Sequence, residues 1–392
     1  MGQIWVLNSV IVVAVHVLAL YGVFTCSLSK STALLVQITW ALSSVGITAG
    51  YHRLWSHRTY EAGTMMRLFL AIAGTLAMQG SIKWWVLRHR LHHRYHFFSL
   101  SNIRFTDSAD DPYNATEGFW FSHIGWIFYR PSYKKFRLVK MDDINGDPIA
   151  YFQHRFYFPL VLVLCVICPL IFGYIFGDMR GAFFYGFCWS RLFVWHSTFF
   201  INSLAHWIGD QEYSLLNSSR GNLFLAVLTA GEGHHNFHHS FPFDYRNGIL
   251  WYHYDPTKWF IYACSRLGLC WNLKVTSKEE IAMAKKSKDD VKYSTNIKDY
   301  LESIGTEVSK LPVLKKTDID QLIGAGKIIL IVENFVVDAT KIMDKHPGGS
   351  NILRINNGRD VTFEFNGGLN SHNVTARLQL AKSVIGQFSS DL

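Results

Sequence analysis

The sequence predicts a mainly α-helical membrane protein, with four membrane-spanning helices, a cytosolic helical cap and a small C-terminal module. Of its 392 residues 49% are hydrophobic and only 17% are charged, and that charged fraction is low for a soluble chain of this size. A hydrocarbon core of about 30 Å takes about 20 helical residues to cross. Four apolar stretches reach this length, residues 4–24, 32–51, 157–177 and 182–202.

The positive charges orient these four spans. The connection between the first two spans carries one charge, Lys30, whereas seven Lys or Arg residues lie between Arg53 and Arg94. Because positively charged loops face the cytosol, we expect the segment after Tyr51, the N-terminus and everything after residue 202 to be cytosolic. The first span begins near Met1 without a basic region or a cleavage site, so we expect it to be retained rather than removed as a signal peptide.

A fifth apolar run, residues 62–79, is predicted to be an interfacial or re-entrant helix rather than a crossing. If it crossed, the histidines before and after it would lie on opposite sides of the membrane. Two shorter apolar pieces, residues 223–230 and 259–271, are too short to cross and are expected to lie along the surface.

The composition divides the chain into three parts. Residues 1–273 form the membrane domain, residues 274–310 a Lys/Glu/Asp-rich helical linker, and residues 311–392 a compact soluble module. The net charge of +9 is spread along the cytosolic segments, which favours an anionic membrane face or an anionic small substrate over nucleic acid. The six cysteines show no disulfide or zinc-ribbon spacing, which indicates a reducing compartment.

Nine of the eighteen histidines fall into spaced groups on the predicted cytosolic side. They are His52 and His57, just beyond the second span; His89, His92 and His93; His206, with Asn202 one helical turn before it; and His235, His238 and His239. The i, i+3, i+4 spacing of the two triplets places three imidazoles on one side of a helix, where several can serve one centre. His234 stands where this pattern demands nothing, and we predict that it is replaceable.

Nine histidines exceed what one ion can use, so the sequence predicts two metal ions with about four ligands each and one spare, and Asn202 able to hold a metal-bound water. Neutral imidazole suits iron, copper, zinc and nickel alike. A hydrolytic zinc site would need a carboxylate base, and no HExxH motif occurs. Two redox-active irons beside a lipid fit better. Histidines that merely face lipid headgroups could explain one group, but not all four.

The C-terminal module carries a separate signal. The motif HPGG places His346 before a tight turn, and His372 follows 26 residues later. Two histidines on facing helical hairpins can be the two axial ligands of one haem, which leaves no open position and favours electron transfer. An incidental histidine in a turn is the alternative for HPGG alone, and the second histidine favours the haem.

At this point the sequence closely resembles the membrane acyl-CoA Δ9 desaturases (stearoyl-CoA desaturases) of the fungal form, which carry a fused C-terminal cytochrome b5 domain. The motifs that carry the resemblance are HRLWSH, HRLHHRY, DPYNA, SHIGWIFYRP, INSLAHWIGD, GEGHHNFHHSFPFDYRNGILWYHYDPTKW and HPGG. The resemblance implies that the C-terminal module is an α+β cytochrome b5-like domain holding haem b through His346 and His372. It also implies a di-iron centre held by all nine grouped histidines, with Asn202 holding a water, and no catalytic side chain beyond these ligands.

The family adds the reaction and its partners. Dioxygen, two electrons and a saturated acyl-CoA, palmitoyl or stearoyl, would give a cis double bond between carbons 9 and 10. The electrons would come from NADH through a separate cytochrome b5 reductase, because no flavin or dinucleotide motif is present. The implied location is the endoplasmic reticulum membrane, among lipid, with the histidine groups and the haem domain in the cytosol.

The resemblance and the helix geometry also suggest substrate-binding residues. By resemblance, Gln79, Trp85 and Thr198 line the kink of the acyl tunnel, and Asn114 is a candidate for holding the CoA. Ser44 and Trp40 lie 8 and 12 residues before His52, roughly 12 and 18 Å deeper along one helical face. The methyl-side half of an 18-carbon chain has a comparable length, so Trp40 is a candidate floor of the tunnel; a lipid-facing Trp40 is the alternative.

One departure from the family keeps two other interpretations open. Residues 96–105 are an insert two positions after the last histidine of the second cluster, where the family runs straight on, and a tolerated loop and a retained intron are equal explanations. The N-terminus lacks the usual cytosolic segment, which leaves the natural start open. The alternatives are another membrane di-iron lipid oxygenase, such as a hydroxylase or a different desaturase, and a catalytically inactive haem-binding membrane protein.

Overall fold

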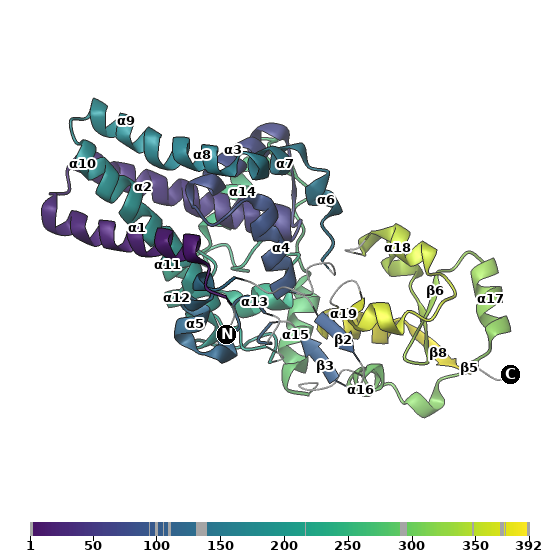
Figure 1. Ribbon diagram of the computed structural model, residues 1–392. Coiled ribbons are helices and arrows are strands. Elements are labelled where there is room, and N and C mark those ends of the chain that lie inside the picture. The colour runs from purple at the N-terminus through teal and green to yellow at the C-terminus, as the bar shows by residue number, and fades with distance from the viewer. Residues whose placement is uncertain are drawn as a thin grey trace. The chain divides into compact units, whose positions relative to one another are not determined.

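The computed structural model describes residues 3–93, 95–98, 101–104, 106–108, 111–130, 139–215, 217–290, 296–346, 349–368, 372 and 374–389. It divides into two compact units (Figure 1). The first comprises Met1–His92, Ala109–Asp210 and Ser218–Val275, and the second comprises His93–Ser108, Gln211–Asn217 and Thr276–Leu392. Each unit is described by itself.

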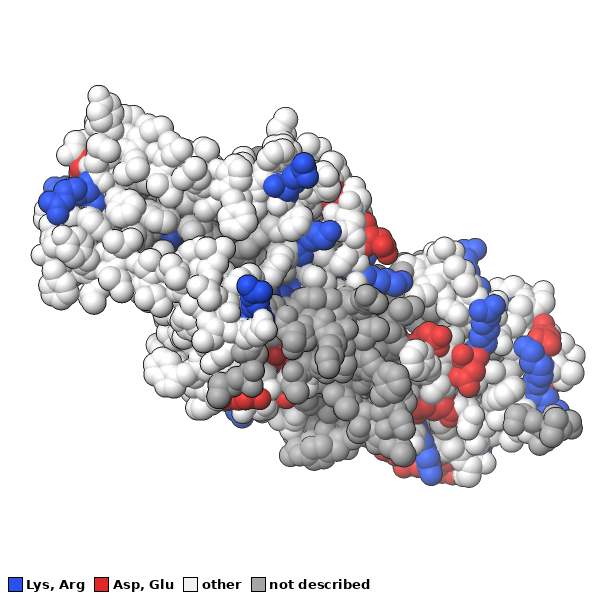
Figure 2. All heavy atoms as spheres, viewed as in Figure 1, with Lys and Arg blue, Asp and Glu red and all other residues white. Residues whose placement is uncertain are grey.

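Long apolar helices dominate the first unit. Within the described residues, three are long and apolar enough to cross a membrane: α1 (Val6–Thr25), the continuous helix Lys30–Ser56 and the continuous helix Tyr157–Ile175. The second consists of α2 (Lys30–Val45) and the π-helix η1 (Gly46–Ser56), and the third of α8 (Tyr157–Val161), η5 (Leu162–Ile167) and α9 (Cys168–Ile175). On the face drawn in Figure 2, charged side chains are sparse over these helices.

The second of these helices extends further than the sequence predicted. The apolar stretch predicted as the second span ends at Tyr51, but the helix continues to Ser56, and Arg53 within it is buried against carboxylates rather than exposed to water. His52 therefore lies within this helix, not beyond it, and His57 follows its last residue. At 27 residues the helix is about 40 Å long, which is longer than a hydrocarbon core.

The fourth predicted span is helical but is more polar than the other three. It contains α10 (Met179–Gly181), η6 (Ala182–Trp189) and α11 (Ser190–Asn202), and it packs against α1 and α2. Arg191 and His196 interrupt its apolar sequence, and the stretch is not among the three apolar helices above. The Arg191 side chain is fully buried, beside Cys165.

The fifth apolar run forms α3 (Thr64–Leu76), whose 13 residues span only about 20 Å. That length is too short to cross a bilayer, which supports the interfacial interpretation. The helix packs closely on the second long helix because Gly46 and Gly74 meet backbone to backbone.

Short helices and one two-stranded sheet complete the first unit. The helices are η2 (Ala115–Glu117), η3 (Gly125–Phe128), η7 (Leu204–His206), α4 (Ile82–His92), α5 (Phe119–His123), α6 (Asp142–Asn145), α7 (Pro148–Arg155), α12 (Leu223–Leu228), α13 (His235–Ser240) and α14 (Pro256–Arg266). Strands β1 (Glu61–Ala62) and β4 (Cys270–Trp271) pair antiparallel. The predicted apolar pieces at 223–230 and 259–271 correspond to α12, to α14 and to β4.

The second unit is a small α+β domain, as the resemblance implied. Its four-stranded sheet has the order β5–β8–β7–β6, in which only the β5–β8 pair is parallel. The strands are β5 (Val313–Leu314), β6 (Ile329–Val332), β7 (Phe335–Asp338) and β8 (Val384–Phe388). Its helices are α15 (Lys278–Asp290), α16 (Ile297–Ser303), η8 (Val308–Lys310), α17 (Lys316–Gly324), η9 (Thr340–Lys345), α18 (Ser350–Ile355), η10 (Glu364–Gly368) and α19 (Val374–Lys382).

Three segments join this unit beyond the predicted module of residues 311–392: His93–Ser108, Gln211–Asn217 and the stretch that begins at Thr276. Helix α16 buries Ile297, Tyr300 and Leu301 in the hydrophobic core of the unit, so the packed part begins before residue 311. Strands β2 (Tyr95–Phe98) and β3 (Ser101–Arg104) pair antiparallel and cover most of the predicted insert 96–105; Ser99, Leu100 and Phe105 lie outside the described residues.

We predict that Gly46→Ala lowers the free energy of unfolding by about 1–3 kcal/mol, because its added methyl would overlap the backbone of Gly74 and Ala73. Gly63→Ala is the matched control, since the nearest atom to its added methyl is 3.6 Å away. Denaturation of both variants in detergent, followed by circular dichroism, measures the difference. Equal stability of the two variants would contradict the close packing of α3.

Candidate metal centre

The structure gathers eight of the nine grouped histidines into two buried sets of four. The first histidine group contains His52, His57, His89 and His238, and the second contains His92, His206, His235 and His239. Within each group the possible ligand nitrogens all lie within 4.8 Å of one another. This arrangement matches the predicted count of about four ligands for each of two ions.

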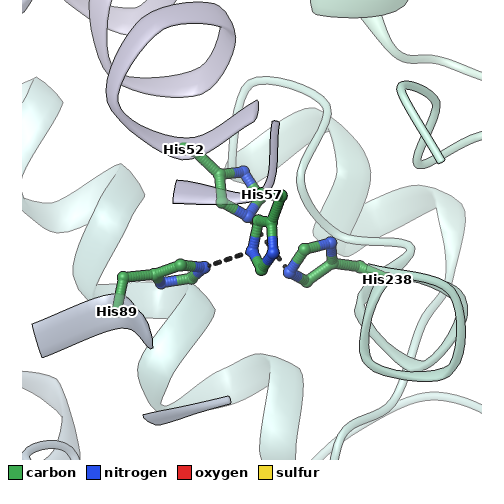
Figure 3. Close-up of side chains that lie close together, drawn as sticks. All are labelled: His52, His57, His89 and His238. Atoms are coloured by element: carbon green, nitrogen blue, oxygen red, sulfur yellow. Dashed lines mark hydrogen bonds between the residues drawn. The ribbon is translucent and has the colours of Figure 1, made fainter. Parts of the chain in front are cut away.

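The first group joins three elements (Figure 3). His52 and His57 come from η1 and its end, His89 from α4 and His238 from α13. The Nε2 atoms of His52 and His238 are 3.0 Å apart, and those of His57 and His89 are 2.7 Å apart.

A π-helical turn brings the two histidines of HRLWSH together. The backbone N–H of His57 donates to the carbonyl of His52, five residues earlier, at 3.1 Å. This i to i+5 bond is the π-helix pattern. It places residues five apart nearly on one face, and the two ring centroids are 4.9 Å apart.

The second group also joins three elements. His92 ends α4, His206 ends the short helix η7, and His235 and His239 lie one turn apart on α13. The Nε2 atom of His235 lies 3.2 Å from that of His206 and 3.0 Å from that of His239, and the Nε2 atoms of His92 and His239 are 3.3 Å apart.

Four of these five distances, 3.0–3.3 Å, fit metal ligation, and the 2.7 Å between His57 and His89 is shorter. Two imidazole nitrogens bound to one ion at about 2.1 Å, with bond angles between a right angle and a tetrahedral angle, lie about 3.0–3.4 Å apart. Ligating imidazole must be neutral. Burial first, and then the neighbouring histidines, lower the pKa of His89 and of His235 well below the ordinary value. Both groups therefore offer neutral nitrogens at a spacing that one ion can bridge.

A cavity of about 530 Å³ borders both groups. His52, His89, His92 and His235 form part of its wall, together with residues of α1, of the second long helix and of α11. The rest of the wall is mostly apolar and aromatic, so the cavity suits a long apolar ligand.

Comparison with known proteins agrees with this architecture. The fatty acid desaturase family matches residues 29–266, and the cytochrome b5-like haem/steroid-binding domain matches residues 314–389. A probable acyl-CoA desaturase of Schizosaccharomyces pombe is 40% identical over 370 residues, which are 93% of this chain and 74% of that protein. The chain belongs to the fatty acid desaturase family.

Two further relatives show the same likeness. Acyl-CoA desaturase 1 of Saccharomyces cerevisiae is 41% identical over 87% of this chain, which spans 65% of that protein. The stearoyl-CoA desaturase of Sus scrofa is 36% identical over 74% of this chain and 79% of its own length. The family resemblance drawn from the sequence motifs is thereby confirmed.

Within this desaturase the histidine triplets are used differently from what their spacing suggested. Each triplet is divided between the two groups, so that His89 and His92 face different centres, as do His238 and its neighbour His239. His93 belongs to neither group. Helix α4 ends at His92, so His93 lies in the following turn and no longer shares a helical face with His89.

The expected spacing of Asn202 one helical turn before His206 is wrong, because α11 ends at Asn202, Ser203 has an irregular backbone and His206 ends the separate 3₁₀-helix η7. Asn202 is the last residue of α11 and lines the cavity, so its role in holding a water stays a prediction. His234 lies outside both groups and stacks on His253, with ring centroids 5.1 Å apart.

Three hydrogen bonds orient the ligands, and sequence reasoning missed their partners. The other ring nitrogens of His52, His92 and His206 contact Glu232 at 3.0 Å, Asp111 at 2.9 Å and Ser218 at 2.7 Å, respectively. Such partners fix the ring orientation and the tautomer of a metal-bound histidine. Glu232 is the second residue of the quoted motif GEGHHNFHH, and Asp111 is the first residue of DPYNA. These motifs are the signal that could have found both residues.

Glu232 is held in its charged form by a buried ion-pair network. Burial alone would raise its pKa, but Arg53 and then His52 lower the pKa to about 2. Arg53 donates to Glu232 at 2.7 Å and to Asp255 at 2.9 Å, and all three side chains are at most 3% exposed. Asn247 donates to the second Glu232 oxygen at 2.6 Å.

The predicted tunnel residues meet across the cavity. Gln79 donates to the Thr198 hydroxyl at 2.8 Å and accepts from the Trp85 indole at 3.4 Å, and all three line the cavity. Ser44 also lines it, whereas Trp40, one turn further along α2, packs behind against the hydrophobic core. Asn114 is buried and caps η2 through its bonds to Thr116, so its role in CoA binding stays a prediction.

The second unit brings the side chains of the two predicted haem ligands close together. The ring centroids of His346 and His372 are 6.1 Å apart. Two imidazoles on opposite sides of one iron, each bound at about 2.0 Å, have ring centroids about 6 Å apart. His372 Nδ1 donates to the Phe365 carbonyl at 2.8 Å, which leaves its Nε2 for a metal. His346 Nδ1 is buried and has no hydrogen-bond partner in the described part of the chain. The pair therefore fits a haem with two axial histidines.

We predict that Glu232→Gln weakens iron binding by the desaturase unit by about 10–100-fold, the range typical for lost outer partners of ligands. The amide would turn an N–H group toward the His52 or Arg53 donor, and Arg53 would lose half of its charge compensation. Iron retained during titration with a chelator measures the effect. Asp143→Asn is the matched control, because Asp143 also pairs with arginines, Arg58 and Arg90, and forms no bond to a histidine of either group in the described part of the chain. Full iron retention by Glu232→Gln would contradict the orienting role.

Proposed function

We propose that the chain is an acyl-CoA Δ9 desaturase, which inserts a cis double bond between carbons 9 and 10 of palmitoyl- or stearoyl-CoA. The observation that carries this proposal is the pair of four-histidine groups beside a mostly apolar cavity, in a chain that also brings His346 and His372 close together. The names of the relatives, acyl-CoA and stearoyl-CoA desaturase, point to the same substrate class.

The overall reaction balances with dioxygen, two electrons and two protons: the acyl chain loses two hydrogens and two waters form. Two bound irons would supply the reduction of dioxygen and the removal of hydrogen from an unactivated carbon. The ligand set supports two such ions, held by the first and the second histidine groups, with Asn202 and His93 as further candidate ligands. The His346 and His372 pair supports a haem b that supplies electrons.

The cavity residues would bind and orient the acyl chain. The Gln79, Trp85 and Thr198 cluster places hydrogen-bonded side chains on facing walls, so an acyl chain that passes the histidines must bend around it. The apolar wall excludes water from the reacting carbons. Ser44 lines the cavity on the second long helix, and we propose that Trp40 behind it closes the methyl end.

The chain would span the endoplasmic reticulum membrane four times, with the helix through α11 as the fourth span. The charge distribution favours a cytosolic N-terminus, cytosolic histidine groups and a cytosolic haem domain, and the short α3 keeps the histidine groups on one side. An NADH-cytochrome b5 reductase is the proposed electron donor.

One observation favours the inactive alternative. His93, a ligand by family resemblance, lies outside both groups, and the β2–β3 hairpin begins two residues later. Expression in a yeast that lacks its own Δ9 desaturase separates the possibilities. Growth without added unsaturated fatty acid, and double bonds at carbon 9, support desaturation. No rescue, together with a normal reduced haem spectrum, would identify an inactive haem protein; double bonds or hydroxyls elsewhere would identify another oxygenase.

We predict that His238→Ala abolishes desaturation and leaves the haem spectrum intact, because His238 belongs only to the first histidine group. His346→Ala should remove the haem spectrum and stop turnover by cutting off electrons. Fatty acid analysis and reduced haem spectra of the same membranes measure both effects. The matched control is His234→Ala, which should retain activity, since His234 lies outside the groups. Loss of activity in His234→Ala would overturn the assignment of ligands on α13.

We predict that Trp40→Ala shifts the product toward longer chains, because removal of the indole would deepen the cavity beyond Ser44. Chain-length analysis of the unsaturated products, from a mixture of saturated acyl-CoA of different lengths, measures the shift. An unchanged product length would contradict the role of Trp40 in closing the cavity.

A further inference from the structure

A chain of three histidines lies outside both histidine groups and connects three segments of the first unit. His16 lies on α1, His196 on α11 and His123 at the end of α5. This histidine chain ends at Ser203, which lies between Asn202 and the short helix η7 that carries His206. None of these residues takes part in the proposed reaction.

The side chains of this histidine chain meet end to end. His16 Nδ1 lies 2.7 Å from the Val12 carbonyl, and His16 Nε2 lies 3.2 Å from His196 Nε2. His196 Nδ1 lies 3.0 Å from His123 Nε2, and His123 Nδ1 lies 3.0 Å from the Ser203 hydroxyl. That hydroxyl also lies 2.9 Å from the Phe199 carbonyl. The nitrogens meet in pairs instead of converging on one point, so the pattern is a hydrogen-bonded chain and not a metal site.

The hydrogens of this chain can be counted. Five contacts each need one hydrogen. Three neutral imidazoles bring three, because a neutral imidazole has one N–H and one acceptor, and the Ser203 hydroxyl brings one. The neutral chain is therefore one hydrogen short.

The shortage falls at Ser203. The Val12 carbonyl can only accept, so His16 carries its hydrogen on Nδ1, and its Nε2 accepts from His196. His196 then accepts from His123, and His123 Nδ1 is left as an acceptor. The single hydrogen of Ser203 thus has two acceptors, the Phe199 carbonyl and His123 Nδ1.

No negative charge compensates an extra proton on the chain. The titratable groups that face one another here are His16 from α1, His196 from α11 and His123 from α5, and none of them pairs with a carboxylate in the described part of the structure. Burial first, and then His196, lower the pKa of His123 to about 4. His123 is consequently neutral at physiological pH.

We propose that His16, His196 and His123 position Ser203. Through Ser203 they position the turn between Asn202 and His206, and His206 belongs to the second histidine group. The inference rests on the proposed function, because it concerns the support of the proposed iron site. Ser203 has an irregular backbone at the end of α11, φ −110° and ψ −81°, so the turn is not fixed by helix geometry. The chain holds it from the side by hydrogen bonds to two other segments.

The test replaces the central residue of the chain in the full-length protein. His196→Leu breaks the chain, whereas His196→Gln retains one donor and one acceptor at a similar spacing. Tyr185→Phe is the matched control: it removes the 2.8 Å bond from Tyr185 to the Cys26 carbonyl, which joins the same two helices without touching the histidines. Iron content during chelator titration, kcat and KM are measured for each variant, and the wild type is measured alongside.

We expect His196→Leu to weaken the binding of one of the two irons by about tenfold or more, and to lower kcat while KM stays unchanged. His196→Gln and Tyr185→Phe should behave like the wild type. Unchanged iron binding in His196→Leu, or equal loss in Tyr185→Phe, would overturn the positioning role.

A second measurement is independent of iron and of turnover. Nitrogen-15 spectra of histidine-labelled protein report the tautomers, and the spectrum of a His16→Leu variant identifies the His16 signals. We expect His16 as the Nδ1–H tautomer. The Nε2–H tautomer would overturn the hydrogen count. If the wild type binds no iron but shows the expected His16 tautomer, the proposed function and the positioning of an iron ligand are refuted. The hydrogen-bonded chain of His16, His196 and His123 would still be established.

Discussion

The buried pairing of Arg53 with Glu232 and Asp255 is the interaction on which the candidate centre depends. An unpaired buried charge is costly, so the three elements that carry these residues are held together: η1, the segment before α13, and the start of α14. The same carboxylate that pairs with Arg53 also accepts from the ring of His52. The network therefore stabilises the contact between these three elements and sets the direction of the His52 ring. The same residues support the fold and the site at this position.

The sequence predicted well which histidines gather, because imidazoles at helical spacing carry a strong signal. It could not predict how they are shared, because spacing along one helix says which face a residue lies on and not which of two neighbouring centres that face meets. The His52 and His57 pair shows a second limit. Five residues apart, they would point in different directions on an α-helix, and only the π-helical turn brings their rings together. His93 shows a third, since its role depends on whether α4 continues by one residue.

Single polar partners were not predictable in the same way. Glu232, Asp111 and Ser218 each contact one histidine, and a lone acid or serine has no regular spacing; only their position inside quoted motifs sets Glu232 and Asp111 apart from surface acids. The extension of the second long helix to Ser56 has the same cause, because Arg53 looks like the end of an apolar span until its buried partners are known. By contrast, the fifth run was expected not to cross because a crossing would separate the histidine groups, and the α+β C-terminal unit followed from the family resemblance, so neither required knowledge of single contacts.

The two short helices α4 and α13 each contribute ligands to both histidine groups, and this sharing constrains the chemistry. His238 and His239 are adjacent on α13, while His89 and His92 are separated by less than one turn of α4. The distance between the two centres is thus set by the geometry of two helices rather than by flexible loops. A distortion that unwinds either helix must move ligands of both centres together, so the two sites are expected to be lost together and not one at a time. The second group differs in that His206 comes from the irregular turn after α11, and it is there that additional support from neighbouring segments has the most effect.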